Sequence, residues 1–138
     1  MLEESVADRY RQSLAALLLV TQSTEMKMPH SQLKFLLGAG DPEMQVIESL
    51  LDSCSQEWEY ATADGRRVHP GNAYRADPVS SEARLVFVEC RFLSDIPDDH
   101  IVVDHHNPGD PGYGSGPDEF WTGSSLGQVV ELLREFGH

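Results

Sequence analysis

Basic residues are scarce in this chain of 138 residues, which has 10 lysines and arginines against 23 aspartates and glutamates and a formal net charge of −13. A surface this acidic repels a phosphodiester backbone, so the composition argues against an extended double-stranded DNA interface. It leaves room for a small phosphorylated substrate, because a bound divalent cation can reverse the local field. A solvated acidic face and a cation site both account for the excess of acid.

Long apolar runs are also missing. The longest, over residues 14–20, is far too short to span a bilayer, and the N-terminus lacks a basic region followed by an apolar signal core. The two cysteines, Cys54 and Cys90, are widely separated and match no metal-binding or redox spacing. We therefore expect reduced thiols in a cytoplasmic protein that has no membrane contact.

Hydrophobic residues make up 40% of the chain, which predicts a globular protein of one domain, or a small domain with a helical extension. Residues 1–56 read as a helical N-terminal segment. An amphipathic helix is expected over residues 2–20, a second from Ser31 to Gly38 or Gly40, and a third after Asp41-Pro42, which supplies an N-cap and a proline at the first helical position. The third helix is expected to end near Cys54.

From residue 57 to residue 138 the pattern predicts an α/β domain with a mainly parallel sheet flanked by helices. Alternation from Trp58 to Thr62, followed by the turn dipeptide Asp64-Gly65, predicts a hairpin that returns over residues 66–69. Buried strands are expected over residues 85–88 and 101–103. A last helix is expected over residues 126–136, after a capping segment that ends in Ser124-Ser125.

Residues with metal-binding chemistry directly follow the two predicted buried strands. Glu89 follows the first, and Asp104-His105-His106 follows the second. If these strands are parallel neighbours, both carboxylates meet at the edge of the sheet where ligands bind in open α/β folds. Carboxylate and imidazole groups suit Mn, Fe or Zn. Because the histidines are adjacent, we expect them to point in different directions, one toward a metal and one toward a phosphate oxygen.

Other polar residues extend this candidate site. Asp110 can return to it, because neighbouring glycines permit a sharp reversal. Ser124 and Ser125 can offer hydroxyls and free backbone N–H groups to a phosphate at the start of the last helix. Simpler interpretations stay open: Glu89 can pair with a nearby arginine, Arg84 or Arg91, and an aspartate beside a proline, such as Asp110, commonly forms a turn.

The run Val102-Val103-Asp104-His105-His106, with an apolar strand upstream and a Ser-Ser-Leu-Gly-Gln-Val-Val helix downstream, resembles the core of the DHH phosphoesterases over roughly residues 85–133. That family contains manganese-dependent pyrophosphatases, exopolyphosphatases, single-strand exonucleases and cyclic-dinucleotide phosphodiesterases. The resemblance implies a Rossmann-like core and a metal-dependent phosphoesterase or phosphoanhydride hydrolase. It also implies a divalent metal, with Mn²⁺ favoured over Mg²⁺ or Zn²⁺, and a small phosphorylated or nucleotide substrate.

Carried over residue by residue, the resemblance makes Asp104 a metal ligand, His105 a ligand or phosphate contact, and His106 a substrate-phosphate contact. Glu89 takes the place of the aspartate that usually ends the preceding strand. The family's first motif, a pair of aspartates after an early strand, is missing from the N-terminal region, and Asp77 is the nearest substitute ligand. No second substrate-binding domain follows the last helix, so a reduced relative and a piece of a longer protein are both open.

Two other function classes remain open. A binding module would keep the fold but have too few ligands for turnover. A winged helix, with three helices followed by the predicted hairpin, would favour a protein partner because the chain is acidic. A Glu-x-Lys nuclease is disfavoured, since Glu89-Cys90-Arg91 has arginine where that chemistry needs lysine. The sequence does not determine the substrate, the number of ions or whether the chain forms a homo-oligomer.

Overall fold

Four parallel strands form the centre of the protein, whose computed structural model describes residues 32–137. Neighbouring strands pair in parallel throughout this sheet, which confirms the expected α/β class with a mainly parallel sheet. In spatial order the strands are β2 (Glu57–Tyr60), β1 (Leu33–Leu37), β5 (Arg84–Val88) and β6 (Ile101–Val103).

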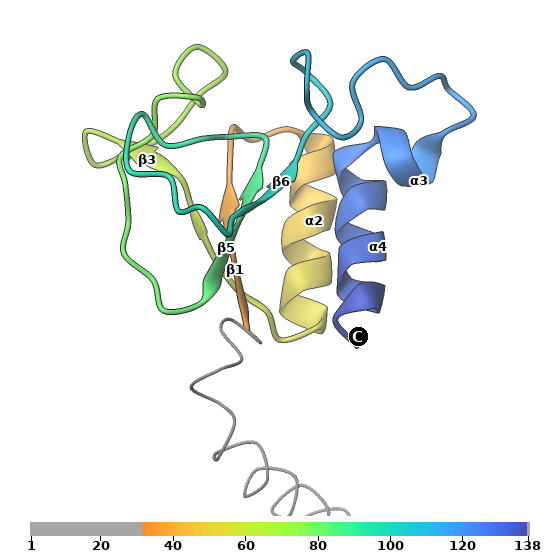
Figure 1. Ribbon diagram of the computed structural model, residues 1–138, viewed down its shortest axis with the longest axis horizontal. Coiled ribbons are helices and arrows are strands. Elements are labelled where there is room, and N and C mark those ends of the chain that lie inside the picture. The colour runs from red at the N-terminus through yellow and green to blue at the C-terminus, as the bar shows by residue number, and fades with distance from the viewer. Residues whose placement is uncertain (1–31, 138) are drawn as a thin grey trace, which may run out of the picture. The chain divides into compact units, whose positions relative to one another are not determined.

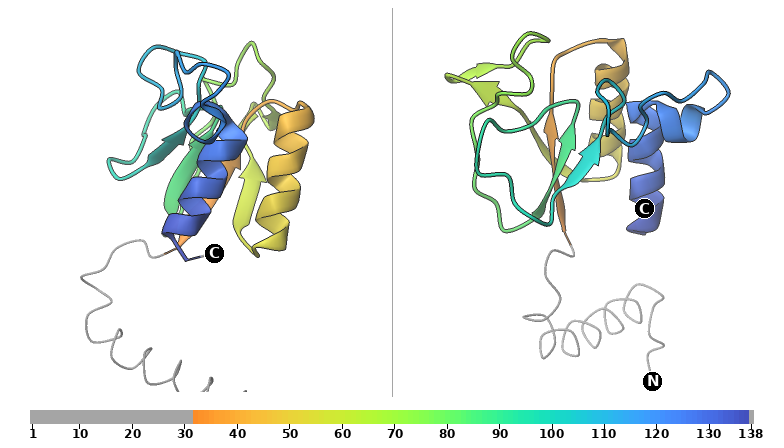
Figure 2. Two further views of the ribbon diagram at one scale, coloured as in Figure 1. Left: turned by 90° about the vertical axis from the view of Figure 1, so that its right-hand side faces the viewer. Right: turned by 45° about the horizontal axis from the view of Figure 1, so that its top comes forward.

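Two helices, α2 (Pro42–Ser53) and α4 (Ser125–Glu135), lie side by side on one face of the sheet (Figures 1 and 2). The Asp41 side chain caps α2 by accepting from the N–H of Met44, and Ser124 caps α4 by accepting from Gly127. Both helices confirm the sequence prediction. A short helix, α3 (Phe120–Gly123), precedes α4. Within residues 32–137 no helix has the length and apolar character needed to cross a membrane.

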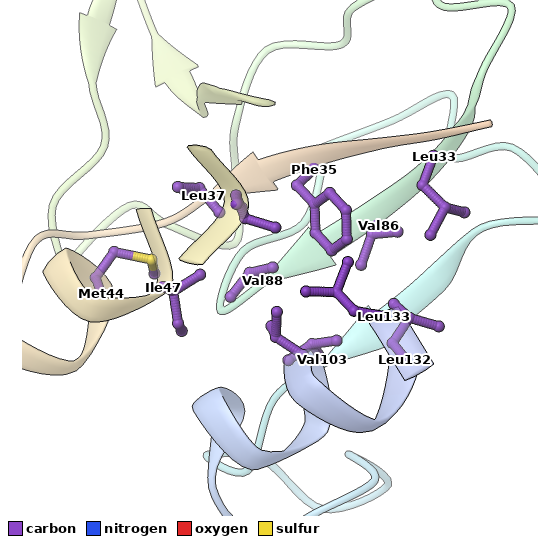
Figure 3. Packing of buried hydrophobic residues seen from close by; sticks show 12 residues of the cluster. Leu33, Phe35, Leu37, Met44, Ile47, Val86, Val88, Val103, Leu132 and Leu133 are labelled. Carbon is purple, nitrogen blue, oxygen red and sulfur yellow. The ribbon is translucent and has the colours of Figure 1, made fainter. Parts of the chain in front are cut away.

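Alternate residues of the central strands fill two cores on opposite faces of the sheet. Phe35, Val86 and Val88 belong to the core beneath the helices (Figure 3). The opposite core is covered by irregular segments instead, and its members are Leu36, Ala61, Val68, Ala73, Ala76, Leu85, Phe87, Cys90 and Phe92. Strands buried on both faces read as continuous apolar runs, which is why β5 was predictable.

The helix predicted from Ser31 to Gly38 or Gly40 is wrong, because residues 33–37 form the central strand β1. Periodicity alone does not separate a short buried strand from a helical turn. The winged-helix alternative is wrong for the same reason. A compact unit begins at Gln32, so α2 and the sheet belong together. The helix predicted over residues 2–20 lies outside the described residues.

A small hairpin, β3 (Thr62–Ala63) and β4 (Arg66–Arg67), follows β2. Its turn is Asp64-Gly65, as predicted, with positive φ at both positions. Trp58 does not belong to this hairpin, because β2 pairs with β1 in parallel and places Trp58 opposite Phe35. The predicted hairpin is therefore correct at its tip and wrong in its first strand.

The carboxyl ends of β1, β5 and β6 lie at the top of Figure 1, where α2 and α4 begin. The link from β5 to β6 contains no helix among the described elements, yet the two strands pair in parallel with Val88 opposite Val103. The next residue of each strand is Glu89 and Asp104. The register therefore sets these two carboxyl groups beside one another.

Candidate metal centre

Glu89 ends β5 in a backbone conformation that is unusual for its residue type. Its φ is 56°, in the left-handed region, which costs an L-residue roughly 1–2 kcal/mol. The surrounding backbone enforces this position: its N–H donates to the Val103 carbonyl at 2.9 Å, and a Cβ on Gly38 would lie 2.2 Å from the Glu89 carbonyl oxygen. Backbone strain of this kind at a strand end suggests a functional role.

The Glu89 side chain is only 9% exposed. Burial raises its pKa from 4.5 to about 7, although the nearby Ser125 hydroxyl and His106 partly oppose the shift. Among the described residues no arginine forms an ion pair with Glu89. Arg84 donates to the Asp99 carbonyl, and Arg91 pairs with other carboxylates. Glu89 is thus a strained, buried carboxyl group whose charged neighbours of opposite sign within 4 Å, among residues 32–137, are the two histidines.

Asp104 ends β6 and is fully buried among hydrogen-bond donors. Its Oδ1 accepts from the backbone N–H groups of His105 (2.8 Å) and His106 (3.3 Å) and from the His106 ring Nδ1 (2.7 Å). Its Oδ2 accepts from the Tyr74 hydroxyl at 2.8 Å and lies 3.5 Å from Arg91. Burial alone would raise the pKa of Asp104, but the hydrogen bonds from His106, Tyr74 and the backbone outweigh it and lower the pKa.

The two histidines converge on Glu89. The His105 Nε2 lies 3.9 Å from one Glu89 oxygen and the His106 Nε2 lies 4.0 Å from the other, while the imidazole ring centroids are 4.3 Å apart. The expectation that adjacent histidines point in different directions is wrong here. The strand has ended at Val103, and both histidine N–H groups turn toward the same Asp104 oxygen, so strand alternation no longer applies.

Together Glu89, His105 and His106 form a group of side chains that could hold a metal ion. One ligand atom from each lies within 4.8 Å of the others. An ionised Asp104 accepts from the His106 Nδ1–H, which in the neutral imidazole leaves Nε2 unprotonated on the side of Glu89; a carboxylate behind a histidine in this way is the usual support of a metal-binding imidazole. One carboxylate and two imidazoles fit a divalent transition ion, with positions left for water or substrate.

Asp104 supports this group from behind, whereas two other predicted ligands lie elsewhere. The Asp110 carboxylate pairs with Arg91 at 2.9 Å and accepts from the N–H of Asn107. Asp77 accepts from the N–H of Asp64 at the β3–β4 turn. The structure brings neither side chain into the glutamate–histidine group. Asp110 makes the local turn contact that the simpler interpretation expected, whereas Asp77 accepts from the backbone of a turn that is remote from it in the sequence.

The two predicted phosphate-binding serines have different surroundings. The Ser124 hydroxyl accepts from the N–H of Gly127 and donates to the carbonyl of Phe120 at 2.7 Å, so it is used within the helix cap. The Ser125 hydroxyl is fully buried and makes no hydrogen bond of regular geometry. It lies close enough to Glu89 to favour the charged carboxylate.

Tyr74 and Gln128 were not foreseen. The Gln128 amide donates to the Asp104 carbonyl at 2.9 Å and accepts from the Asp104 N–H at 3.2 Å, which joins α4 to the end of β6. Gln128 follows the cap residue Ser124 by one helical turn, a spacing that could have signalled it. Tyr74 lies in an irregular segment. An isolated parallel bridge between Ala76 and Phe92 joins this segment to the chain that follows β5, and the local sequence carries no signal for that contact.

A cavity of about 210 Å³ opens beside the candidate metal ligands. Glu89 and His106 form part of its wall, together with residues of the β1–α2 connection and of the segment that carries Tyr74. The lining residues are Ala39, Gly40, Asp41, Pro70, Ala73, Tyr74, Glu89 and His106.

Comparison of the chain with protein-family models, with curated proteins and with solved structures gives no match. The site must therefore be interpreted from its own chemistry.

Proposed function

We propose that this protein is a metal-dependent hydrolase of phosphoesters or phosphoanhydrides with a DHH-like core. The observation that carries the proposal is the convergence of the Glu89 carboxyl group with the Nε2 atoms of His105 and His106, with the His106 ring hydrogen-bonded to Asp104 on its other side. A buried, strained carboxylate with two imidazoles is costly to assemble at a strand end. Its cost is most simply explained by a cation.

A divalent ion bound here would polarise a phosphoryl oxygen and make its bound water more acidic. Asp104 holds the His106 ring in one tautomer and one orientation. His105 would complete the set of ligands with Glu89 and His106, and its partly exposed side chain leaves the ion open to a phosphoryl oxygen from solvent. Arg91 balances the buried charge of Asp104 and Asp110, so that the carboxylate behind the histidines stays ionised.

The resemblance to the DHH phosphoesterases supports this proposal at the ends of β5 and β6, and differs from it at β1. An early strand does exist, but it ends in Gly38-Ala39-Gly40-Asp41 and not in a pair of aspartates. Because Asp104 and Asp110 are engaged by donors of the protein, the converging side chains suit a single ion. Mn²⁺ and Zn²⁺ both accept this set of ligands.

A metal-binding module without turnover is the second candidate. The observation that favours it is the small number of ligands: three side chains converge among the described residues, and the candidate aspartates Asp77 and Asp110 lie outside the group. Such a module would bind the ion and a phosphorylated ligand without cleaving it.

The test is a titration of the metal-free protein with Mn²⁺ and Zn²⁺ by calorimetry, followed by phosphate release from phenyl phosphate and pyrophosphate. We expect binding of one ion and metal-dependent release, both lost in His106→Ala. His100→Ala is the control, because that imidazole lies against Phe87, away from the site. Ion binding without release would support the binding module, and no ion binding would contradict both candidates.

A further inference from the structure

The cavity beside the metal centre adjoins the place where a reacting phosphate would lie. Glu89 and His106 belong both to the candidate ligand group and to the cavity wall. A molecule whose phosphate lies at these residues therefore extends its remaining part into the cavity. The chemistry of the other walls indicates what that part is.

The residues that line the cavity are mostly apolar or acidic. His106 is the one basic side chain among them, and Arg67, next to Gly40, is engaged by the Gly38 carbonyl and the Tyr60 ring. Pro70, Ala73 and Tyr74 supply the apolar surface, whereas Asp41 and Glu89 are acidic. With Glu89 held by the ion, Asp41 is the free carboxylate of the lining, and it repels a second phosphate or a carboxyl group. A carboxylate accepts hydrogen bonds from hydroxyl groups, and an apolar wall suits the C–H face of a ring. The complementary group is uncharged and carries hydroxyls.

Asp41 is held in place for this role by the helix that it caps. Its Oδ1 accepts from the N–H of Met44 at 2.7 Å, which fixes the carboxylate at the start of α2. The structure records no hydrogen bond to the second oxygen among the described residues. A rigid carboxylate with one oxygen available loses little side-chain freedom when a ligand binds.

The volume limits the size of the group. Pockets for drug-sized ligands usually measure about 300–1,000 Å³. At about 210 Å³ the cavity itself has room for one ring, and the base of a nucleoside would extend beyond it toward solvent.

We infer that the substrate class is the phosphate monoester of a single sugar ring, with the ring hydroxyls on Asp41 and the phosphate at the Glu89–histidine group. This inference rests on the proposed function. In the reaction the bond from phosphorus to the sugar oxygen breaks and the oxygen of water bonds to phosphorus. One proton of the water goes to the departing sugar oxygen, so the products are the free sugar and inorganic phosphate.

The test compares ribose 5-phosphate with ethyl phosphate, which has no ring and no free hydroxyl. Binding by calorimetry and phosphate release are both measured on the full chain with Mn²⁺. Asp41→Ser keeps a good helix cap and removes the second carboxylate oxygen. We expect it to weaken binding and raise KM for ribose 5-phosphate by about tenfold or more, and to leave ethyl phosphate unchanged.

Glu43→Gln is the matched control. Glu43 lies in the first turn of α2, does not line the cavity, and acts on the pKa of Glu89 in the same direction as Asp41. An effect that comes only from lost negative charge would therefore appear in both variants. An effect through the hydroxyl contact appears in Asp41→Ser alone.

The outcomes separate the two proposals. If ribose 5-phosphate binds and Asp41→Ser weakens this binding, but no phosphate is released from it, from phenyl phosphate or from pyrophosphate, the hydrolase is wrong and the sugar site stands. If ethyl phosphate is cleaved as well as ribose 5-phosphate and Asp41→Ser affects both equally, the sugar site is wrong and the hydrolase stands. Adenosine 5′-monophosphate binding more tightly than ribose 5-phosphate would overturn the limit to one ring.

Discussion

Two neighbouring strands end in a buried carboxyl group, and the protein treats the two groups in opposite ways. Asp104 accepts five contacts from donors, including Tyr74 and Arg91, and its pKa is lowered. Glu89 is at a strained backbone position, has no arginine partner among the described residues, and its pKa is raised to about 7. The donors around Asp104 stabilise a charge within the fold itself. In the described part of the chain Glu89 has no such set of donors, and on the proposed function a bound cation would stabilise its charge.

On the proposed function, this difference separates a metal ligand, Glu89, from Asp104, the residue that orients the histidines. Asp104 accepts hydrogen bonds from the backbone of both histidines and from the ring of His106. The Glu89 carboxyl group lies near the Nε2 atoms of both histidines, where an ion could bind all three side chains. Exchanging a carboxyl group for an amide should therefore lower mainly the metal affinity at Glu89 and mainly the folding stability at Asp104.

The largest effect is expected for metal binding in Glu89→Gln. The variant loses the only carboxylate of the converging group, so its affinity for Mn²⁺ should fall by more than about 100-fold, beyond the loss usual for outer contacts. Its stability should hardly change, because the amide is neutral like the protonated carboxyl group that burial favours. Calorimetry and urea unfolding measure the two quantities. Unaltered affinity would contradict the role of Glu89 as a ligand.

The opposite pattern is expected for Asp104→Asn. Removing this charge leaves Arg91 partly uncompensated and puts an amide where four hydrogen bonds and an ion pair now converge, which should reduce the free energy of unfolding by about 3 kcal/mol. Metal affinity should fall only by roughly 10–100-fold. Asp118→Asn, at an exposed position, is the control for loss of charge. Equal stability of the two variants would remove the distinction between the strand ends.

The titration of Glu89 and His106 should determine how stability changes with pH above pH 4.5. Below pH 4.5 the titration of Asp104 should determine it. The raised pKa of Glu89 means that the folded state binds the proton more tightly, so metal-free protein loses stability as pH rises from 4.5 through 7. The raised pKa of His106 acts in the same direction near neutrality, whereas the lowered pKa of Asp104 makes stability fall as pH drops below 3.8.

Thermal unfolding in EDTA should therefore give a higher Tm at pH 5 than at pH 8. Glu89→Gln should remove most of that difference. With Mn²⁺ the trend should reverse, because the ion displaces the protons and its affinity rises with pH. A metal-free Tm that is higher at pH 8 than at pH 5 would show that Glu89 is not buried as described.

The smallest effect concerns the backbone of Glu89 and not its carboxyl group. With φ at 56°, glycine fits better than alanine, so Glu89→Gly should be more stable than Glu89→Ala by about 1 kcal/mol. Urea unfolding of the two variants measures this difference. Equal stability would mean that the strand end relaxes once its side chain is removed.

Sequence patterns predicted the elements whose signals are local. The strands before Glu89 and Asp104 are uninterrupted apolar runs, and α2 and α4 begin at capping residues. The central strand β1 was missed because four apolar residues and a lysine before a glycine also suit the last turn of a helix. Strand β2 was paired wrongly, because a parallel partner lies across α2 and leaves no mark on neighbouring residues.

In the candidate site, too, the residues with a local sequence signal were predictable and the contacts between remote segments were not. Position at a strand end identified Glu89 and the histidine pair. The role of Asp104 was not predictable, since its donors Tyr74 and Arg91 come from segments remote from it in the sequence. The direction of the histidine rings was also beyond the sequence, because it depends on a turn around one carboxylate oxygen.

The amide of Gln128 has one more consequence. The Gln128 amide makes two hydrogen bonds to the backbone of Asp104, and the Gly112 N–H donates to the Asp104 carbonyl. These bonds hold the first part of the connection between β6 and α4 in place. The part beyond residue 112 is mostly exposed. Lengthening a surface loop costs little entropy. Extra residues inserted near 116–118 should leave the histidines in place, which makes this stretch the natural position for grafting new sequence.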